Sequence, residues 1–179
     1  MKDTLIVNLY GGPGSGKSTT CAGLYARLKC RGILCEQVLE YAKELVWENN
    51  TTKLADQIYI FGKQNRRMNV VRGKVDVIIT DSPLLLSIIY GANNYPEFKA
   101  LVVSEFRKMR TVDVFLDRSG LDYQTEGREQ TEDGAHEKDR EILRMFDELG
   151  IISDMVSGPL DRRLDVIEEL VLEKISGGK

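Results

Sequence analysis

Short apolar runs alternate with longer segments of helical period along almost the whole chain. Five of these runs are apolar enough to form strands buried on both faces, and they span residues 5–10, 33–39, 75–80, 111–116 and 151–156. The segments between them predict helices at residues 16–30, 52–71, 83–90, 97–109, 135–149 and 160–175. Buried strands joined by helices are typical of a parallel sheet that helices cover on both faces. We therefore predict an α/β protein with three layers, α/β/α, around a five-stranded parallel sheet.

The composition indicates one globular domain. The chain has 179 residues, enough for a single core, and no repeat or linker divides residues 1–179. The net charge of −3 gives no indication of non-specific binding of nucleic acid, and a local basic groove is the open alternative, so a small molecule is the favoured partner. We expect a cytoplasmic protein, in the host cytoplasm if a phage encodes it, since no run is apolar enough to span a membrane and no export signal begins the chain. A homodimer is compatible with this sequence.

One loop carries a specific phosphate-binding signature. The stretch YGGPGSGKST, residues 10–19, fits the pattern G-x-x-x-x-G-K-S and lies between a predicted strand and a predicted helix. Glycines let backbone N–H groups converge on an anion, and the helix N-terminus adds further unpaired N–H groups. Lys17 is predicted to reach the β- and γ-phosphates, and Ser18 to bind Mg²⁺. We predict that ATP, with GTP as an open alternative, is bound by Gly12, Pro13, Gly14, Ser15, Gly16, Lys17, Ser18 and Thr19.

Two acidic residues close the second and third predicted strands. Asp81 ends the run VDVIITD, at the sheet edge where ligands of α/β proteins bind, and is predicted to hold Mg²⁺. The alternative is that it caps the helix near Pro83. Glu40 is predicted to act as general base or to contact the acceptor, and its alternative is a surface residue opening the next helix. Which of the two carboxylates takes the acceptor proton stays open.

The predicted helix at residues 52–71 carries two stripes. The first is apolar and is expected to pack on the sheet: Leu54, Ile58, Phe61, Met68 and Val71. The second is polar and is predicted to read a base edge or a phosphate, with a solvated face as the equal alternative: Gln57, Gln64 and Arg67. Three aromatic residues are candidates to line an acceptor pocket, although aromatic residues more often belong to a core: Tyr41, Trp47 and Tyr59.

The most polar segment of the chain, residues 118–140, is predicted to be a mobile lid. Arg128 is our first choice for neutralising charge at the γ-phosphate, and Arg118 is a second nucleotide contact. The alternative is an acidic loop whose arginines pair only with their neighbours. After the last predicted strand, Ser157 and Gly158 are expected to border the purine ring.

Four segments resemble a known family: YGGPGSGKST, LEYAKELVWE, DQIYIFGKQNRR and VDVIITDSPLLL. With the arginine-containing lid, they are similar to the small phosphate-loop domain shared by ribosylnicotinamide kinase modules and many phage-encoded ATP-binding proteins. The likeness runs from about residue 5 to about residue 156. The resemblance implies the fold of the phosphate-loop NTPases. Asp81 is followed by serine and proline, so the arginine that commonly follows this acid in deoxynucleoside kinases is absent.

The wider group of nucleoside and nucleotide kinases has a similar layout, and the resemblance implies its roles for this chain. The acid closing the second strand acts as base and the acid closing the third serves the metal, which places Glu40 and Asp81 in those roles. A glutamine on the following helix reads the base, a role for Gln57 or Gln64. The lid supplies arginines, a role for Arg118 with Arg128.

These observations predict an ATP- and magnesium-dependent kinase that acts on a nucleoside, a nucleoside monophosphate or a related ribosyl compound. Its catalytic residues are predicted to be Lys17, Glu40, Asp81 and Arg128. The runner-up is a kinase of a polynucleotide end or a modified DNA base, and an alternative of another class is a nucleotide-dependent switch. We find no N-K-x-D element of GTPases, and we expect no added helical domain of the kind that ring-forming AAA ATPases have. Both points favour transfer to a bound acceptor over regulated hydrolysis.

Overall fold

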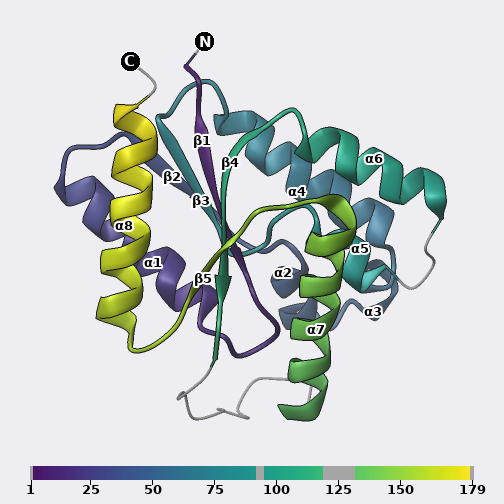
Figure 1. Ribbon diagram of the computed structural model, residues 1–179. Coiled ribbons are helices and arrows are strands. Elements are labelled where there is room, and N and C mark those ends of the chain that lie inside the picture. Colours follow the sequence, from purple (N-terminus) through teal and green to yellow (C-terminus); the bar gives the residue numbers. More distant parts are fainter. Residues whose placement is uncertain (1, 92–94, 119–131, 178–179) are drawn as a thin grey trace.

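A five-stranded, all-parallel sheet forms the centre of the computed structural model, which describes residues 2–91, 95–118 and 132–177 (Figure 1). The strand order is β2-β3-β1-β4-β5. The strands are β1 Leu5–Tyr10, β2 Cys35–Val38, β3 Val77–Thr80, β4 Arg110–Leu116 and β5 Asp154–Val156. The helices are α1 Lys17–Cys30, α2 Ala42–Trp47, α3 Thr51–Leu54, α4 Gln57–Val71, α5 Leu86–Tyr90, α6 Pro96–Phe106, α7 Glu132–Leu149 and α8 Leu160–Ser176.

The sheet divides the core in two, and the side chains of its central strand β1 alternate between the two faces. Ile6 and Tyr10 face one cluster, to which α4, α5, α6 and α7 contribute. Leu5, Val7 and Leu9 face the other, to which α1 and α8 contribute. Figure 1 shows α1 and α8 on one side of the strands and α4 to α7 on the other. The prediction of three layers around a five-stranded parallel sheet is confirmed.

The predicted helix at residues 52–71 is wrong in one respect, because the chain forms two helices there. The Asp56 carboxylate accepts a hydrogen bond from the Tyr59 N–H at 2.9 Å, so Asp56 caps a new helix, α4. The short helix α3 precedes it and is capped by Asn50, whose side chain accepts from the Lys53 N–H at 3.2 Å. Helix α2, just after Glu40, was not predicted as a separate helix.

The break changes which side chains of this region are buried. Phe61 and Met68 lie in the core as predicted, whereas Leu54 belongs to α3 and Ile58 is 58% exposed. Ile60 is buried instead, because α4 begins at Gln57 and presents a different face to the sheet. The polar residue Gln64 shares this buried face.

A buried polar contact ties β1 to β4 under the helices. The Asn8 amide donates to Asp113 Oδ1 at 2.9 Å, and the Thr111 hydroxyl donates to Asp113 Oδ2 at 2.6 Å. Burial raises the pKa of Asp113, while both hydrogen bonds act in the opposite direction. The Asn8–Asp113 bond therefore fixes β1 to β4 just before β1 leads into the phosphate loop.

Helix α7 begins at Glu132, so residues 132–140 of the predicted lid are helical. Residues 119–131 of that segment lie outside the described residues.

No helix in the described ranges is both long enough and apolar enough to cross a membrane.

Candidate functional site

The phosphate loop joins β1 to α1 at the carboxyl end of the central strand. Gly11, Gly14 and Gly16 have φ angles of 139°, 85° and 87°, a region that favours glycine. In the described parts of the chain, no group accepts a hydrogen bond from the N–H of Gly14 or Gly16. The N–H groups of Lys17 and Ser18 belong to the first turn of α1, where a helix offers them no acceptor. This set of free donors can bind an anion.

Lys17 lies folded over the same loop. Its ammonium group donates to the carbonyl oxygen of Gly11 at 2.6 Å and to that of Gly12 at 3.0 Å. Burial lowers the pKa of Lys17, while the nearby carboxylates of Glu40 and Asp81 act in the opposite direction. The ammonium group is thus held against the backbone of the phosphate loop.

Asp81 connects the start of α1 to the residues that follow β2 and β3. The Ser18 hydroxyl donates to its Oδ2 at 2.7 Å, and the Glu40 N–H donates to its Oδ1 at 3.0 Å. Its side chain is only 4% exposed. The structure therefore brings together Ser18, Glu40 and Asp81, which the sequence placed in the metal and base roles.

The oxygens of Ser18 and Asp81 suit a magnesium ion. No described group of three or more His, Cys, Asp or Glu side chains forms a complete metal-binding cluster. Mg²⁺ commonly takes only one or two protein oxygens and completes its shell with phosphate oxygens and water. A hydroxyl and a carboxylate beside a phosphate loop fit that requirement.

Glu40 is half-buried at the edge of this network. Burial raises the pKa of its carboxyl group, as does the Asp81 carboxylate, whereas Lys17 and Lys43 lower it. Tyr90, on α5, lies close enough for the Glu40 charge to affect it, and burial together with that charge raises the Tyr90 pKa above its usual range. The sequence analysis did not single out Tyr90.

A second group of predicted residues gathers next to Glu40. Gln64 is 3% exposed, and its Oε1 accepts a hydrogen bond from the Tyr41 N–H at 3.1 Å. In the described part of the chain its amide nitrogen has no partner. The Arg67 guanidinium lies 4.9 Å from the Tyr41 ring centroid and donates to the Leu39 carbonyl at 3.3 Å. Gln64, Tyr41 and Arg67 thus lie together.

The other candidates for the acceptor pocket are arranged differently. The Tyr59 hydroxyl lies 2.8 Å from that of Tyr41, so these two aromatic residues are in contact. Trp47 is 78% exposed and lies in no core. Gln57 donates to the Leu54 carbonyl at 3.3 Å in the turn where α4 begins. Gln64 is therefore better placed than Gln57 to read an acceptor.

Arg118 binds the outside of the phosphate loop and is 9% exposed. Its Nε donates to Asp139 Oδ2 at 2.6 Å, and one terminal nitrogen donates to the Pro13 carbonyl at 3.0 Å. Asp139 Oδ1 in turn accepts from the Gly12 N–H at 2.6 Å. Arg118 is thus engaged with protein groups, and its predicted nucleotide contact remains a prediction. Arg128 lies outside the described residues.

Arg163 is a site residue that the sequence analysis missed. It lies on α8, is 2% exposed, and donates to the Ser15 carbonyl and to the Asp117 carbonyl, both at 2.6 Å. A signal was present, because Arg163 lies in helical register with the buried Ile167 and Val171. A charged residue on an apolar stripe needs a buried partner.

Asp139 was missed in the same way. It lies in helical register with two buried residues of α7, Ala135 and Ile142.

Ser157 and Gly158 do lie in the turn between β5 and α8, near Arg163 in sequence. Their contact with a purine ring remains a prediction, as does a role for Thr19, whose side chain is exposed.

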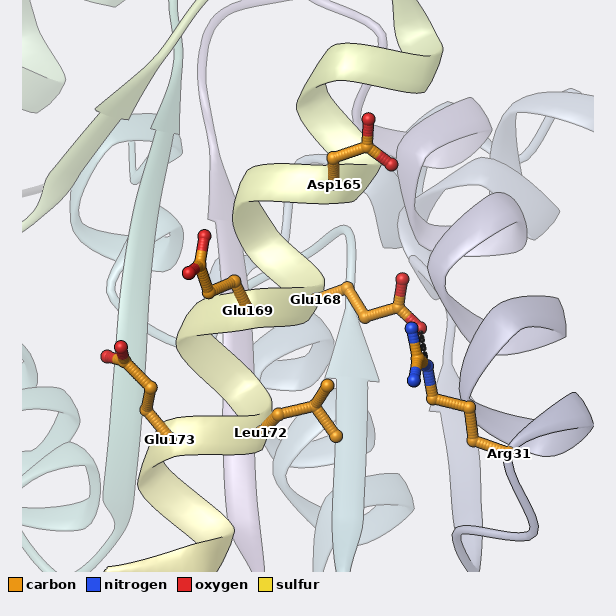
Figure 2. Close-up of a pocket in the computed structure, with 6 residues that line it drawn as sticks. All are labelled: Arg31, Asp165, Glu168, Glu169, Leu172 and Glu173. Atoms are coloured by element: carbon orange, nitrogen blue, oxygen red, sulfur yellow. Dashed lines mark hydrogen bonds and ion pairs between the residues drawn. The ribbon is translucent and has the colours of Figure 1, made fainter.

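A separate hollow of about 310 Å³ lies between the C-terminal end of α1 and helix α8 (Figure 2). Figure 2 shows Arg31 paired with Glu168 there, and three further carboxylates in the lining. Lys17 lies at the other end of α1. The surplus of carboxylates makes this hollow unsuitable for a phosphate group, so we assign it no part in the site.

Comparison with known proteins places the chain in a family and identifies its fold. A family model described as an AAA domain matches residues 6–163. The solved structure of NadR protein in complex with NR is 19% identical with a TM-score of 0.68, and the match covers 96% of this chain but only 50% of that one. A search of the curated proteins finds no match.

Two further solved structures are similar over nearly their full length. Deoxyadenosine kinase from M. mycoides is 14% identical with a TM-score of 0.52, covering 97% of this chain and 100% of that one. The APS kinase CysC of Mycobacterium tuberculosis, in complex with AMPPNP and APS, is 14% identical with a TM-score of 0.56, covering 97% and 99%. At these identities the likeness concerns the fold, which is that of the phosphate-loop nucleoside and nucleotide kinases.

Proposed function

The chain belongs to the AAA domain family, and from that premise we propose that it is an ATP- and magnesium-dependent kinase of a nucleoside, a nucleoside monophosphate or a related ribosyl compound. The observation that carries the proposal is the position of Asp81. Its two carboxylate oxygens hold the Ser18 hydroxyl and the Glu40 N–H, at 2.7 and 3.0 Å. The phosphate loop, the oxygens proposed to bind the metal and the backbone of Glu40 are therefore connected by hydrogen bonds.

The similar structures support the kind of acceptor. One is named as a kinase of deoxyadenosine and another as a kinase of APS, and the third holds NR. Because this chain spans half the length of the NadR chain, the activity of that whole protein is not transferred to it. These names, together with the buried amide of Gln64, support a nucleoside-like acceptor for this chain.

On the donor side, the free N–H groups of the phosphate loop would bind the phosphate oxygens of ATP. Lys17 would exchange its bonds to the Gly11 and Gly12 carbonyls for the β- and γ-phosphates. Ser18 and Asp81 would hold Mg²⁺, which when bound supplies positive charge at the β- and γ-phosphate oxygens. Arg128 is proposed to add charge at the γ-phosphate.

On the acceptor side, Glu40 would receive the proton. The acceptor oxygen forms a bond to the γ-phosphorus while the bond from that phosphorus to the β–γ bridging oxygen breaks, and ADP leaves. The acceptor proton passes to the Glu40 carboxylate. Gln64 would donate from its unpartnered amide nitrogen to the acceptor, because the Tyr41 N–H already fixes the other end of this amide.

The test is transfer of label from γ-labelled ATP to a panel of nucleosides, nucleoside monophosphates and ribosyl compounds. We expect labelled product with at least one of them, and only when magnesium is present. A single-stranded oligonucleotide in the same panel tests the polynucleotide alternative, which gains if it alone is labelled. Release of phosphate to water alone, with every acceptor unlabelled, would contradict the kinase proposal and favour a nucleotide-dependent switch.

A further inference from the structure

Two buried arginines hold the phosphate loop from outside. Arg118 donates to the Pro13 carbonyl at 3.0 Å, and Arg163 donates to the Ser15 carbonyl at 2.6 Å. These carbonyls belong to the peptide groups that end in the N–H of Gly14 and the N–H of Gly16. Within the described ranges, those N–H groups have no acceptor. Each arginine therefore binds the carbonyl oxygen of a peptide group whose N–H has no acceptor among the described residues.

Because a peptide group is planar, a hydrogen bond to its carbonyl oxygen also fixes the direction of its N–H. In a planar trans peptide the C=O and N–H bonds point in opposite directions, and the described chain contains no cis peptide. Holding a carbonyl toward the outside therefore directs the N–H of the same peptide group inward. The φ angles of Gly14 and Gly16, 85° and 87°, let both N–H groups turn to the concave side of the loop.

The arginine on α8 is firmly anchored. Its second terminal nitrogen donates to the Asp117 carbonyl at 2.6 Å, and the Asp117 N–H donates to the Val156 carbonyl at 2.9 Å. Arg163 thus links the loop to the edge of the sheet between β4 and β5. Arg163 is 2% exposed, and no described carboxylate forms an ion pair with it. Burial lowers the pKa of its guanidinium, while the Asp117 charge acts in the opposite direction. Its positive charge is therefore weakly screened and adds to the attraction of an anion in the loop.

Arg118 differs in one respect. Its Nε is paired with the Asp139 carboxylate at 2.6 Å, so its charge is neutralised locally. Its third nitrogen donates to the Ala135 carbonyl at 3.5 Å. Arg118 orients the loop, while Arg163 both orients it and contributes charge.

We propose that Arg163, with Arg118 on the other side of the loop, is a positioning residue that fixes the Ser15–Gly16 peptide group with its N–H toward the phosphates. The inference rests on the function proposed above and adds a residue that touches no substrate. It concerns binding of the polyphosphate and does not depend on which acceptor the protein uses.

The experiment measures binding of magnesium ATP and of inorganic tripolyphosphate by calorimetry. The variants are Arg163→Met, which removes charge and donors at similar volume, and Arg163→Lys, which keeps the charge but cannot bridge both carbonyls. The control is Arg162→Met, because Arg162 is the exposed neighbour on the same helix. Circular dichroism fixes a temperature at which every protein is folded.

We expect Arg163→Met to weaken binding of both ligands by about tenfold to a hundredfold, the usual effect of losing a charged hydrogen bond. Arg163→Lys should bind with intermediate affinity, and Arg162→Met should bind within about twofold of the wild type. Loss of tripolyphosphate binding identifies the phosphate loop as the affected part, since this ligand has no base or ribose.

Several results would overturn the inference. One is an Arg163→Met protein with a lower melting temperature but wild-type affinity for both ligands, which would make Arg163 a purely structural residue. Should Arg163→Met fail to fold, wild-type affinity of Arg163→Lys would do the same. If the wild-type protein binds both ligands but labels no acceptor, only the kinase proposal is contradicted. The role of Arg163 is then still decided by the affinities of its variants for the two ligands.

Discussion

Ser18 and Asp81 lie 63 residues apart in the chain, and the Ser18 hydroxyl donates to the Asp81 carboxylate at 2.7 Å. The two residues stand at the start of α1 and just after β3, and the pairing of β1 with β3 brings these points together. The hydroxyl and carboxylate oxygens lie side by side next to the phosphate loop. This pair is the natural first target for mutation.

Asp81→Asn should reduce phosphoryl transfer by about a hundredfold or more, because it removes the charged oxygen expected to hold Mg²⁺. Titration of the reaction with magnesium should show a higher requirement for the metal. Asp76→Asn is the matched control, since Asp76 is an exposed residue just before β3 that pairs with Lys2 at 2.6 Å. Equal magnesium dependence in the Asp81 variant and the wild type would contradict the metal role.

Lys17→Ala should reduce transfer by about a hundredfold or more, because the ammonium group that neutralises the phosphates is lost. The fold should survive, since the two hydrogen bonds of this side chain go only to the Gly11 and Gly12 carbonyls. Turnover and the melting temperature are measured on the same preparation. Retained turnover would remove Lys17 from the mechanism.

Glu40→Gln should reduce transfer by about 100- to 10,000-fold, the usual contribution of a general base. Binding of ATP should change little, because the bond to Asp81 comes from the backbone N–H of residue 40 and persists in the variant. The control is Glu36→Gln on β2, a residue whose only described ion pair is with Lys29. If Asp81 rather than Glu40 takes the proton, Glu40→Gln will keep most of its activity.

Gly12→Ala should destabilise the protein by about 1–3 kcal/mol, the usual range for overpacking. An added Cβ would come within 2.5 Å of the Ala135 carbonyl oxygen and within 2.8 Å of the Arg118 guanidinium. Gly62→Ala is the opposite case, because nothing lies within 4 Å of a Cβ at that position in α4. It should stabilise the protein by about 0.5–1 kcal/mol. Denaturant unfolding measures both, and similar values for the two variants would contradict the packing argument.

Asp113 should make stability depend on pH in a defined direction. Burial raises its pKa above the ordinary value of 3.8 for an aspartate, so the folded protein keeps a proton that the unfolded chain has already lost. The contribution of this group to stability therefore falls as pH rises from about 4 through the raised pKa, and is constant above it. The difference in melting temperature between wild type and Asp113→Asn should decrease over that range. A difference that is constant or increases with pH would contradict the buried position of this acid.

Much of the site was predictable because it depends on local pattern. The phosphate loop is one continuous motif, and every donor in it lies between residues 10 and 20. Glu40 and Asp81 were predictable for a topological reason, since parallel strands bring their carboxyl ends to the same edge of a sheet. The hydrogen bond between the Glu40 N–H and Asp81 confirms that the two residues meet there.

The helix at residues 52–71 shows where local pattern was insufficient. Its apolar period continues through Asp56, and only the hydrogen bond of that side chain to the Tyr59 N–H marks the break. Asp56 is an acceptable residue within a helix as well as a good cap. The choice between the two depended on packing against the sheet, which buries Ile60 and leaves Ile58 exposed.

The sequence by itself determined the layers of this protein, the anion-binding loop and the acids beside it, because each follows from short-range spacing or from strand order. Only the tertiary structure decided what holds the loop in place. Asp139 meets Gly12 across 127 residues of sequence, and Arg163 meets Ser15 across 148. Such contacts arise when α7 and α8 pack against opposite faces of the sheet, and the charge of a side chain does not reveal which distant carbonyl or N–H group it will meet.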